Sequence, residues 1–221
     1  MPDGEEIPAH AKFAKTTTGT DAAEQGTRGL ASELLAALLG KAMGASVPTT
    51  EVIELTEQMK IVLRNNEVPE SGLAVASHTI DPAIDVPNPD ALNGVPIEEL
   101  ARISALESWT EMGDRSHNMI RSGNTAYSID HASGFGSSWA GIVPPSQLVV
   151  NTLTQDRLAA DPAARASAAD ALARVTDEQI DSIVDQVPEA WLGKSQKERF
   201  KINLKASRDN VAQMMRGAAN P

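Results

Sequence analysis

The residues best suited to chemistry lie in the run GDRSHNMIRSGNTAYSIDHASGFG, residues 113–136. Asp114 and Asp130 stand at the two ends of a predicted β-hairpin, and Asn118 stands between them. The hairpin is predicted over 119–129, because two short apolar strands flank the turn sequence Ser-Gly-Asn. Since a hairpin brings its ends together, we expect these three side chains to converge.

Two carboxylates and an amide form a set of hard oxygen donors. Such a set suits Mg²⁺, which proteins commonly bind through one or two carboxylates together with the phosphates of a nucleotide. Phosphoryl transfer needs a carboxylate to orient the attacking hydroxyl and further oxygen donors to hold the metal. Taken singly, each residue could equally be a loop residue; their order and spacing favour a joint role.

The first third of the chain is expected to build a small sheet and one strong helix. Leucines three and four residues apart predict the helix over 29–43, which Gly44 ends. Runs rich in β-branched or apolar residues predict strands at 10–15, 50–55, 60–64 and 72–77.

The rest of the chain is expected to be mainly helical. Residues 79–95, with their prolines and aspartates, predict a connector, and Pro96 opens a helix that Gly113 ends. Further helices are predicted over 156–174, from a capping box of Thr176 and Gln179, and from a second box of Ser195 and Glu198.

Several segments together resemble the HipA-like kinase family, which is related to protein kinases and phosphoinositide kinases. The motif D-R-x-x-N at 114–118, followed by an apolar strand and I-D-H at 129–131, is similar to the catalytic and metal-binding loops of that family. The segments Ala11-Lys12-Phe13, SELL at 32–35 with GASVP at 44–48, and the C-terminal RVTDEQIDSIVDQVPEAW and ASRDNV agree with it in order. The resemblance spans nearly the whole chain.

The resemblance implies roles for five residues. Lys12 would bind the α- and β-phosphates of a nucleotide, and Glu33 would pair with it. Asp114 would orient or deprotonate the acceptor hydroxyl, whereas Asn118 and Asp130 would coordinate Mg²⁺. Lys15 is the alternative to Lys12 as the phosphate-binding lysine, and Glu33 could also be an ordinary solvated helix residue.

Further contacts to the nucleotide are expected from loops. Arg115 and His117 would shape the catalytic loop beside the cofactor, and the segment 72–80, with Ala74 and Ala76, would approach the adenine. Another expectation concerns the phosphates. Only 11 residues precede Lys12, and they hold one glycine, so a full glycine-rich hairpin does not fit there. Either another segment covers the phosphates, through the hydroxyl and backbone groups of Thr17, Thr18 and Gly19, or such a loop is absent.

The resemblance also implies a fold. We expect a single α+β domain over 1–221 with a two-lobed, protein-kinase-like architecture. Residues 1–78 would form a small sheet-plus-helix N-lobe, 79–95 a connector, and 96–221 a larger, mainly helical C-lobe.

Composition excludes several other classes. The chain carries 19 Lys and Arg against 30 Asp and Glu, a formal charge of −11, which disfavours nucleic acid and anionic membranes as partners. It has no cysteine, which excludes disulfides and thiolate chemistry. The sequence shows neither a signal-peptide pattern nor a membrane-length apolar run, so a cytoplasmic location is expected. The oligomeric state stays open.

The expected function is that of an ATP- and Mg²⁺-dependent serine/threonine-type kinase. The acceptor would be a hydroxyl of a protein, the chain itself included. Three alternatives remain: a nucleotide-binding protein with little or no turnover that acts through a protein partner, a kinase for a small molecule or lipid headgroup, and nucleotidyl rather than phosphoryl transfer.

Overall fold

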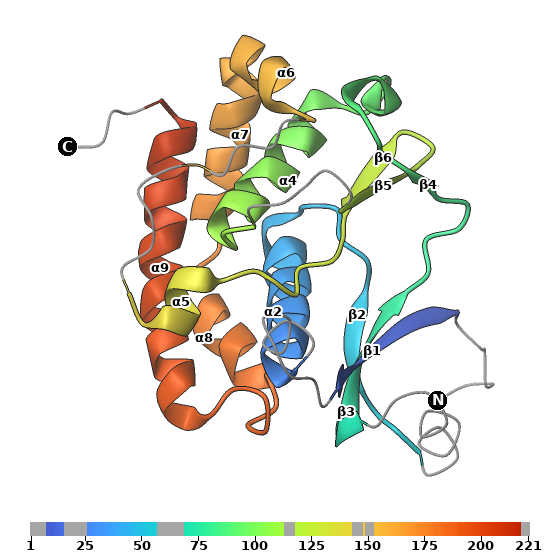
Figure 1. Ribbon diagram of the computed structural model, residues 1–221. Helices are drawn as coiled ribbons and strands as arrows, with labels where there is room; N and C mark the ends of the chain where they lie inside the picture. The colour runs from blue at the N-terminus through green and yellow to red at the C-terminus, as the bar shows by residue number, and fades with distance from the viewer. Residues whose placement is uncertain are drawn as a thin grey trace.

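The protein has a mixed α+β fold, and the computed structural model describes residues 8–15, 26–56, 69–112, 118–142, 148 and 153–217. A small sheet lies to one side of helix α2, and most of the remaining helices lie to its other side (Figure 1). The elements in chain order are β1 (Ala9–Lys15), α2 (Thr27–Met43), β2 (Thr50–Glu54), β3 (Pro69–His78), β4 (Ile84–Asp85), the 3₁₀ turn η1 (Pro89–Leu92), α4 (Ile97–Trp109), β5 (Met119–Ser122), β6 (Thr125–Ser128), α5 (Gly136–Ala140), α6 (Gln155–Ala160), α7 (Pro162–Ala173), α8 (Asp177–Gln186) and α9 (Lys194–Met215). Within the described ranges, none of these helices combines the length and apolar character needed to cross a membrane.

The first sheet is antiparallel, with strand order β1-β3-β2. Lys12 of β1 and Val52 of β2 both pair with Val75 of β3, so these three side chains share one face. That face packs against α2. Three of the strands predicted from the sequence are confirmed, whereas the fourth, at 60–64, lies outside the described residues.

Helix α2 is buried on nearly all sides. Its leucines pack against the sheet and the helical part at once, and every residue from Gly29 to Ala37 is buried. The helix ends as predicted at Gly44, whose φ of 75° is the left-handed conformation that glycine adopts without strain. Near that end, Gly40 allows a close approach: a β-carbon there would lie 2.8 Å from Val47 Cγ1 and 2.9 Å from Leu106 Cδ2.

The predicted hairpin is confirmed as β5 and β6, joined by a turn at Gly123 and Asn124. A short strand, β4, adds to its edge and gives a second sheet of order β4-β5-β6. The connector expected over 79–95 therefore contains regular structure, since Ile84 pairs with Arg121 and a 3₁₀ turn follows.

The helical part differs from the sequence expectations in where helices begin and end. Helix α4 ends at Trp109 rather than at Gly113, and Glu111 just beyond it has a left-handed φ of 56°. The helix expected over 156–174 is two helices, because Pro162 opens α7 and Asp161 caps it by accepting from Ala164 N at 2.9 Å.

Helix α8 begins with the predicted capping box of Thr176 and Gln179. Helix α9 does not begin at the predicted box of Ser195 and Glu198. It starts at Lys194, and Gln196 Oε1 accepts a hydrogen bond from Gly193 N at 3.0 Å. Ser195 therefore lies inside the first turn.

Candidate active site

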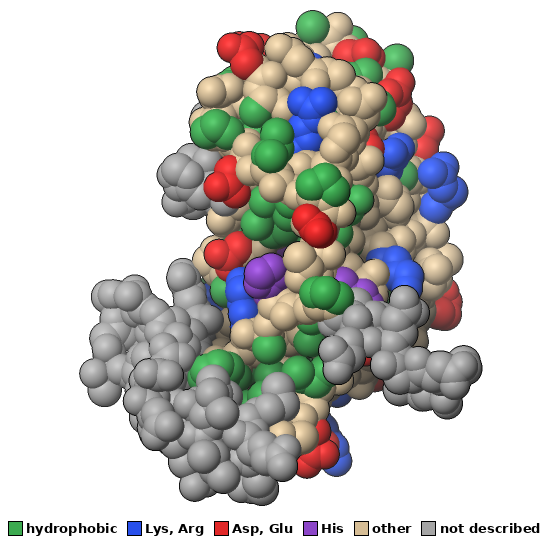
Figure 2. Space-filling model, turned by 90° about the vertical axis from the view of Figure 1, so that its right-hand side faces the viewer, with side chains coloured by type: hydrophobic (Ala, Val, Ile, Leu, Met, Phe, Trp, Pro, Cys, Tyr) green, Lys and Arg blue, Asp and Glu red, His purple; other side chains and the backbone are tan. Residues whose placement is uncertain are grey.

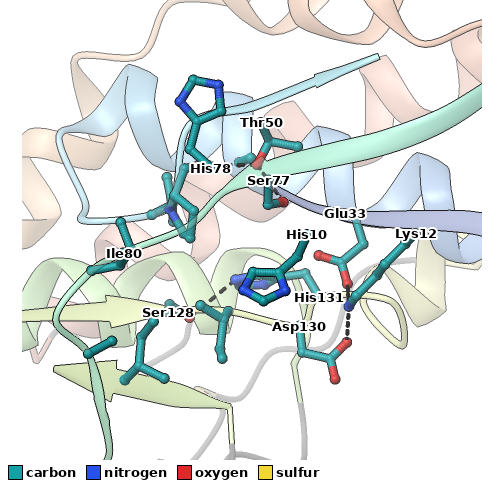
Figure 3. Close-up of a pocket in the computed structure, with 16 residues that line it drawn as sticks. His10, Lys12, Glu33, Thr50, Ser77, His78, Ile80, Ser128, Asp130 and His131 are labelled. Atoms are coloured by element: carbon teal, nitrogen blue, oxygen red, sulfur yellow. Dashed lines mark hydrogen bonds and ion pairs between the residues drawn. The ribbon is translucent and has the colours of Figure 1, made fainter. Parts of the chain in front are cut away.

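Three charged side chains from distant parts of the chain meet at one end of a cavity (Figure 3). Lys12 Nζ donates hydrogen bonds to Glu33 Oε1 and, at 2.7 Å, to Asp130 Oδ1. Strand β1 supplies the lysine, the first half of α2 supplies the glutamate, and the aspartate follows β6.

Local structure explains why these side chains meet. Alternation along β1 turns Lys12 and Ala14 to the same face, and Ala14 is packed in the core beside α2. Asp130 has a φ of 56°, a left-handed conformation that aspartate tolerates better than most residues. Asn118 braces it: Asn118 O accepts from Ile129 N at 3.0 Å, and Asn118 Nδ2 donates to Asp130 O at 3.5 Å.

The three charges shift one another's proton affinity. Burial opposes the charge on Lys12, but the carboxylates of Glu33 and Asp130 outweigh that effect and raise the pKa of the ammonium group. Burial raises the pKa of Glu33, an effect that Lys12 opposes and the nearby Asp130 charge reinforces. Burial also opposes the charge on Asp130, yet the hydrogen bond and charge of Lys12 prevail and lower its pKa. At neutral pH Lys12 and Asp130 therefore form a charged pair.

The cavity next to this cluster is large enough for a nucleobase. Its volume is about 430 Å³, and strands, helix α2 and the residues after β6 all contribute to its wall. It is lined by His10, Lys12, Glu33, Ala37, Val47, Pro48, Thr50, Ser77, His78, Ile80, Ala83, Ile120, Ser128, Ile129, Asp130 and His131. Figure 2 shows the face of the molecule that lies on the right in Figure 1. At mid-height on this face, histidine and Lys or Arg side chains lie among hydrophobic ones.

A buried polar network lies behind Asp130. His131 Nε2 and Ser128 Oγ are 3.2 Å apart, and Ser128 Oγ donates to Glu107 Oε1 at 3.4 Å. All three residues are buried. This network was not predicted from the sequence, in which the one signal for it is a glutamate among the apolar positions of α4.

Of the segment predicted to contact adenine, only part lines the cavity. Ala74 and Ala76 pair with Phe13 and Ala11, so they lie on the sheet face opposite Lys12 and do not line the cavity. Ser77, His78 and Ile80, further along the same segment, do line it.

The remaining predicted residues fall into two groups. Lys12, Glu33, Asn118 and Asp130 lie together as described above. Six lie outside the described residues: Thr17, Thr18, Gly19, Asp114, Arg115 and His117.

The donor set fits a hard divalent cation held jointly with a nucleotide. Half of the Asp130 side chain is exposed to solvent, 51%, so its carboxylate is accessible, and Asn118 lies beside it. Among the residues that the structure describes, no three His, Asp or Glu side chains are grouped as a metal site. Phosphate oxygens would therefore have to complete the coordination, as Mg²⁺ commonly requires.

Comparisons with known proteins concern the family and the fold of the chain. A family model described as HipA-like kinase matches residues 20–220, a range that includes Glu33, Asn118 and Asp130 and begins after Lys12. The fold is similar to that of the proinflammatory kinase CtkA of Helicobacter pylori, with a TM-score of 0.57 at 11% sequence identity, over 95% of this chain and 86% of that one. No curated protein matches the chain. The two-lobed, kinase-like α+β fold expected from the sequence is thus confirmed, while the lobe boundaries stay a prediction.

Proposed function

This chain belongs to the HipA-like kinase family, and we propose that it transfers the γ-phosphoryl group of ATP, with Mg²⁺, to a serine or threonine hydroxyl of a protein. The observation that supports this most is the joint contact of Lys12 with Glu33 and Asp130 beside a cavity of about 430 Å³. A nucleotide kinase site needs a cation for phosphates, an acid to hold that cation in place, and an oxygen donor for metal.

Each residue has a proposed task. Glu33, which is buried, holds the Lys12 ammonium so that it can bind the α- and β-phosphates. Asp130 and Asn118 would hold Mg²⁺, which when bound neutralises charge on the phosphates. The base would occupy the cavity next to Ser77 and His78.

The roles of the loop residues are proposed from the family resemblance. Asp114 would orient the acceptor hydroxyl and take its proton as the oxygen attacks the γ-phosphorus and the bond from that phosphorus to the β,γ-bridging oxygen breaks. Arg115 and His117 would shape that loop. Thr17, Thr18 and Gly19 would donate hydrogen bonds to phosphate.

Nucleotide binding would exchange partners within the charged cluster. Lys12 contacts Asp130 directly at 2.7 Å, and both side chains are about half exposed, 46% and 51%. An exposed ion pair contributes only about 0–1 kcal/mol, so its loss is easily offset when phosphate meets the lysine and a cation meets the aspartate. Glu33 would keep its contact with Lys12 throughout.

Charge and the family resemblance support the proposed class of acceptor. We propose a protein acceptor, this chain itself included, in the cytoplasm. The formal charge of −11 disfavours nucleic acid and anionic membranes as partners.

The test is transfer of label from γ-labelled ATP by the purified chain with Mg²⁺, alone and with a protein extract. We expect label on serine or threonine of the chain or of an extract protein, and none with EDTA. Binding of ATP, measured by calorimetry, without any transfer would instead indicate a nucleotide-binding protein that acts through a partner. Label from α-labelled ATP would indicate nucleotidyl transfer, and label found only on small molecules or lipids would contradict the protein acceptor.

A further inference from the structure

The segment that follows Asp130 is bound to helix α2 through Trp139. Trp139 Nε1 donates to Ser32 Oγ at 3.1 Å, and Ser32 Oγ donates to Gly134 O at 3.4 Å. Ser32 is fully buried and directly precedes Glu33. One side chain of α2 thus forms two hydrogen bonds with residues 134–139.

The ring of Trp139 makes two further contacts. The Arg28 guanidinium, one turn before Ser32 on α2, lies 5.3 Å from the ring centroid, a cation–π contact. Phe200 of α9 meets the ring edge-on at 4.8 Å between centroids. Trp139 therefore joins α2 to the helical part, and Figure 1 shows α5, which carries it, next to α9.

The segment 134–139 is anchored independently of α2. Thr110 O accepts from Phe135 N at 2.6 Å, and Glu111 Oε2 accepts from Ser137 N at 2.9 Å. A β-carbon at Gly134 would lie 3.1 Å from Thr110 O, so only glycine fits this approach easily. The end of α4 therefore fixes the segment from which Trp139 projects.

Hydrophobic packing alone selects the rotation of α2 poorly. Apolar residues surround the N-terminal half of this helix rather than forming one stripe, and apolar burial is non-directional. The close contact of Gly40 with Val47 and Leu106 fixes the C-terminal half. In the N-terminal half, Ser32 and Arg28 make directional contacts with Trp139, in addition to the contact of Glu33 with Lys12.

We propose that Trp139 is a positioning residue: through Ser32 it fixes the rotation of α2 at which Glu33 meets Lys12. Successive residues of a helix are about 100° apart around its axis, so holding Ser32 toward Trp139 also sets the direction of Glu33. The inference rests on the proposed function only in assuming that Lys12 binds phosphate.

Two variants with matched controls test this. S32A and W139F each remove the hydrogen bond between the two residues. W109F and S207A are the controls, because Trp109 Nε1 donates to Leu204 O at 2.9 Å and Ser207 Oγ donates to Trp109 O at 3.4 Å; both bonds are buried, and neither involves Ser32, Glu33 or Trp139. We expect S32A and W139F to weaken calorimetric binding of Mg-ADP roughly tenfold, within the usual range of coupling between sites. The controls should lower Tm by as much without changing affinity.

The route through Glu33 is tested in the E33Q background. If Trp139 acts through Glu33, W139F weakens binding in the wild type and adds nothing to E33Q. An equal loss in both backgrounds, or an equal loss in the controls, overturns the proposal.

Failure of the proposed function gives a different result. If the wild type binds no Mg-ADP, the proposed function fails, and hydrogen exchange of the α2 amides tests the positioning role by itself. Faster exchange over residues 29–33 in W139F and S32A than in W109F and S207A supports it. Equal exchange in all four variants overturns it.

Discussion

Nζ of Lys12 lies 2.7 Å from Oδ1 of Asp130, a residue 118 positions away in the chain. Asp130 holds this place with a left-handed backbone, φ 56°, between the end of β6 and the buried His131. Its charge and its backbone conformation are therefore separate requirements, and a substitution can remove one without the other.

The variant D130N removes the charge and keeps the backbone. Asparagine adopts the left-handed region readily, so we expect D130N to fold normally and to lose phosphoryl transfer by at least roughly 100-fold, as is common when an electrostatic contact to a transferring group is removed. D130A should lose transfer as well and, in addition, about 1–2 kcal/mol of stability from backbone strain. Transfer assays and urea unfolding check the two effects separately; normal transfer by D130N would contradict the metal-binding role.

The pair of Lys12 and Asp130 predicts a specific pH dependence of stability. The lowered pKa of Asp130 means that its contribution is present above the ordinary aspartate pKa of about 3.9 and is lost as the pH falls through the lower folded value. The raised pKa of Lys12 means that its contribution is present below about 10.4 and is lost only as the pH rises through a higher value.

The Tm difference between wild type and D130N should therefore be constant from about pH 5 to 9 and shrink below about pH 4. Because both side chains are half exposed, we expect no more than about 2–4 °C. Thermal unfolding of the nucleotide-free proteins across this range measures it, and a difference that changes between pH 6 and 8 would assign the effect to another group.

The buried network behind Asp130 predicts a larger effect on stability. Ser128 Oγ links His131 Nε2 at 3.2 Å to Glu107 Oε1 at 3.4 Å. S128A removes both contacts in a buried setting, so we expect a loss of about 1–3 kcal/mol in the free energy of unfolding. The matched control is S77A, since Ser77 is half-buried at the cavity and shares one contact, at 3.1 Å, with Thr50 Oγ. Urea unfolding should show the smaller loss for S77A; equal losses would mean that the network adds nothing.

The sequence predicted the elements that local signals determine. The turn at Ser-Gly-Asn identified the hairpin that ends at Asp130, and the leucine spacing identified the helix that carries Glu33. Single positions along a strand are harder to predict, because a shift of one residue moves a side chain to the other face. In the segment 72–80, which the family resemblance placed near the adenine, Ser77 lines the cavity, whereas Ala74 and Ala76 do not.

Contacts between distant segments left no sequence signal of their own. Nothing in the spacing of Ser32 and Trp139, which are 107 positions apart, indicates that they share a hydrogen bond. Glu107 and Ser128 also join distant segments, a helix and a strand, and the sequence hints at this only through a glutamate among the apolar positions of α4. Lys12, Glu33 and Asp130 could be grouped in advance because they resemble a family pattern, whereas the residues that support them depend on the packing of this particular chain.

The close approach at Gly40 predicts that alanine there is destabilising, although alanine is the better helix former. Alanine would add about 1 kcal/mol through helix propensity, but its β-carbon would lie 2.8 Å from Val47 Cγ1 and 2.9 Å from Leu106 Cδ2. Overpacking of this kind costs about 1–3 kcal/mol, so G40A should show a small net loss in urea unfolding. V47A removes one of the two obstructing side chains, and the double variant G40A/V47A should therefore be more stable than the sum of the single losses predicts. Strict additivity would mean that α2 moves to accommodate the methyl group. In that case Glu33 moves with the helix, and G40A should weaken Mg-ADP binding as well.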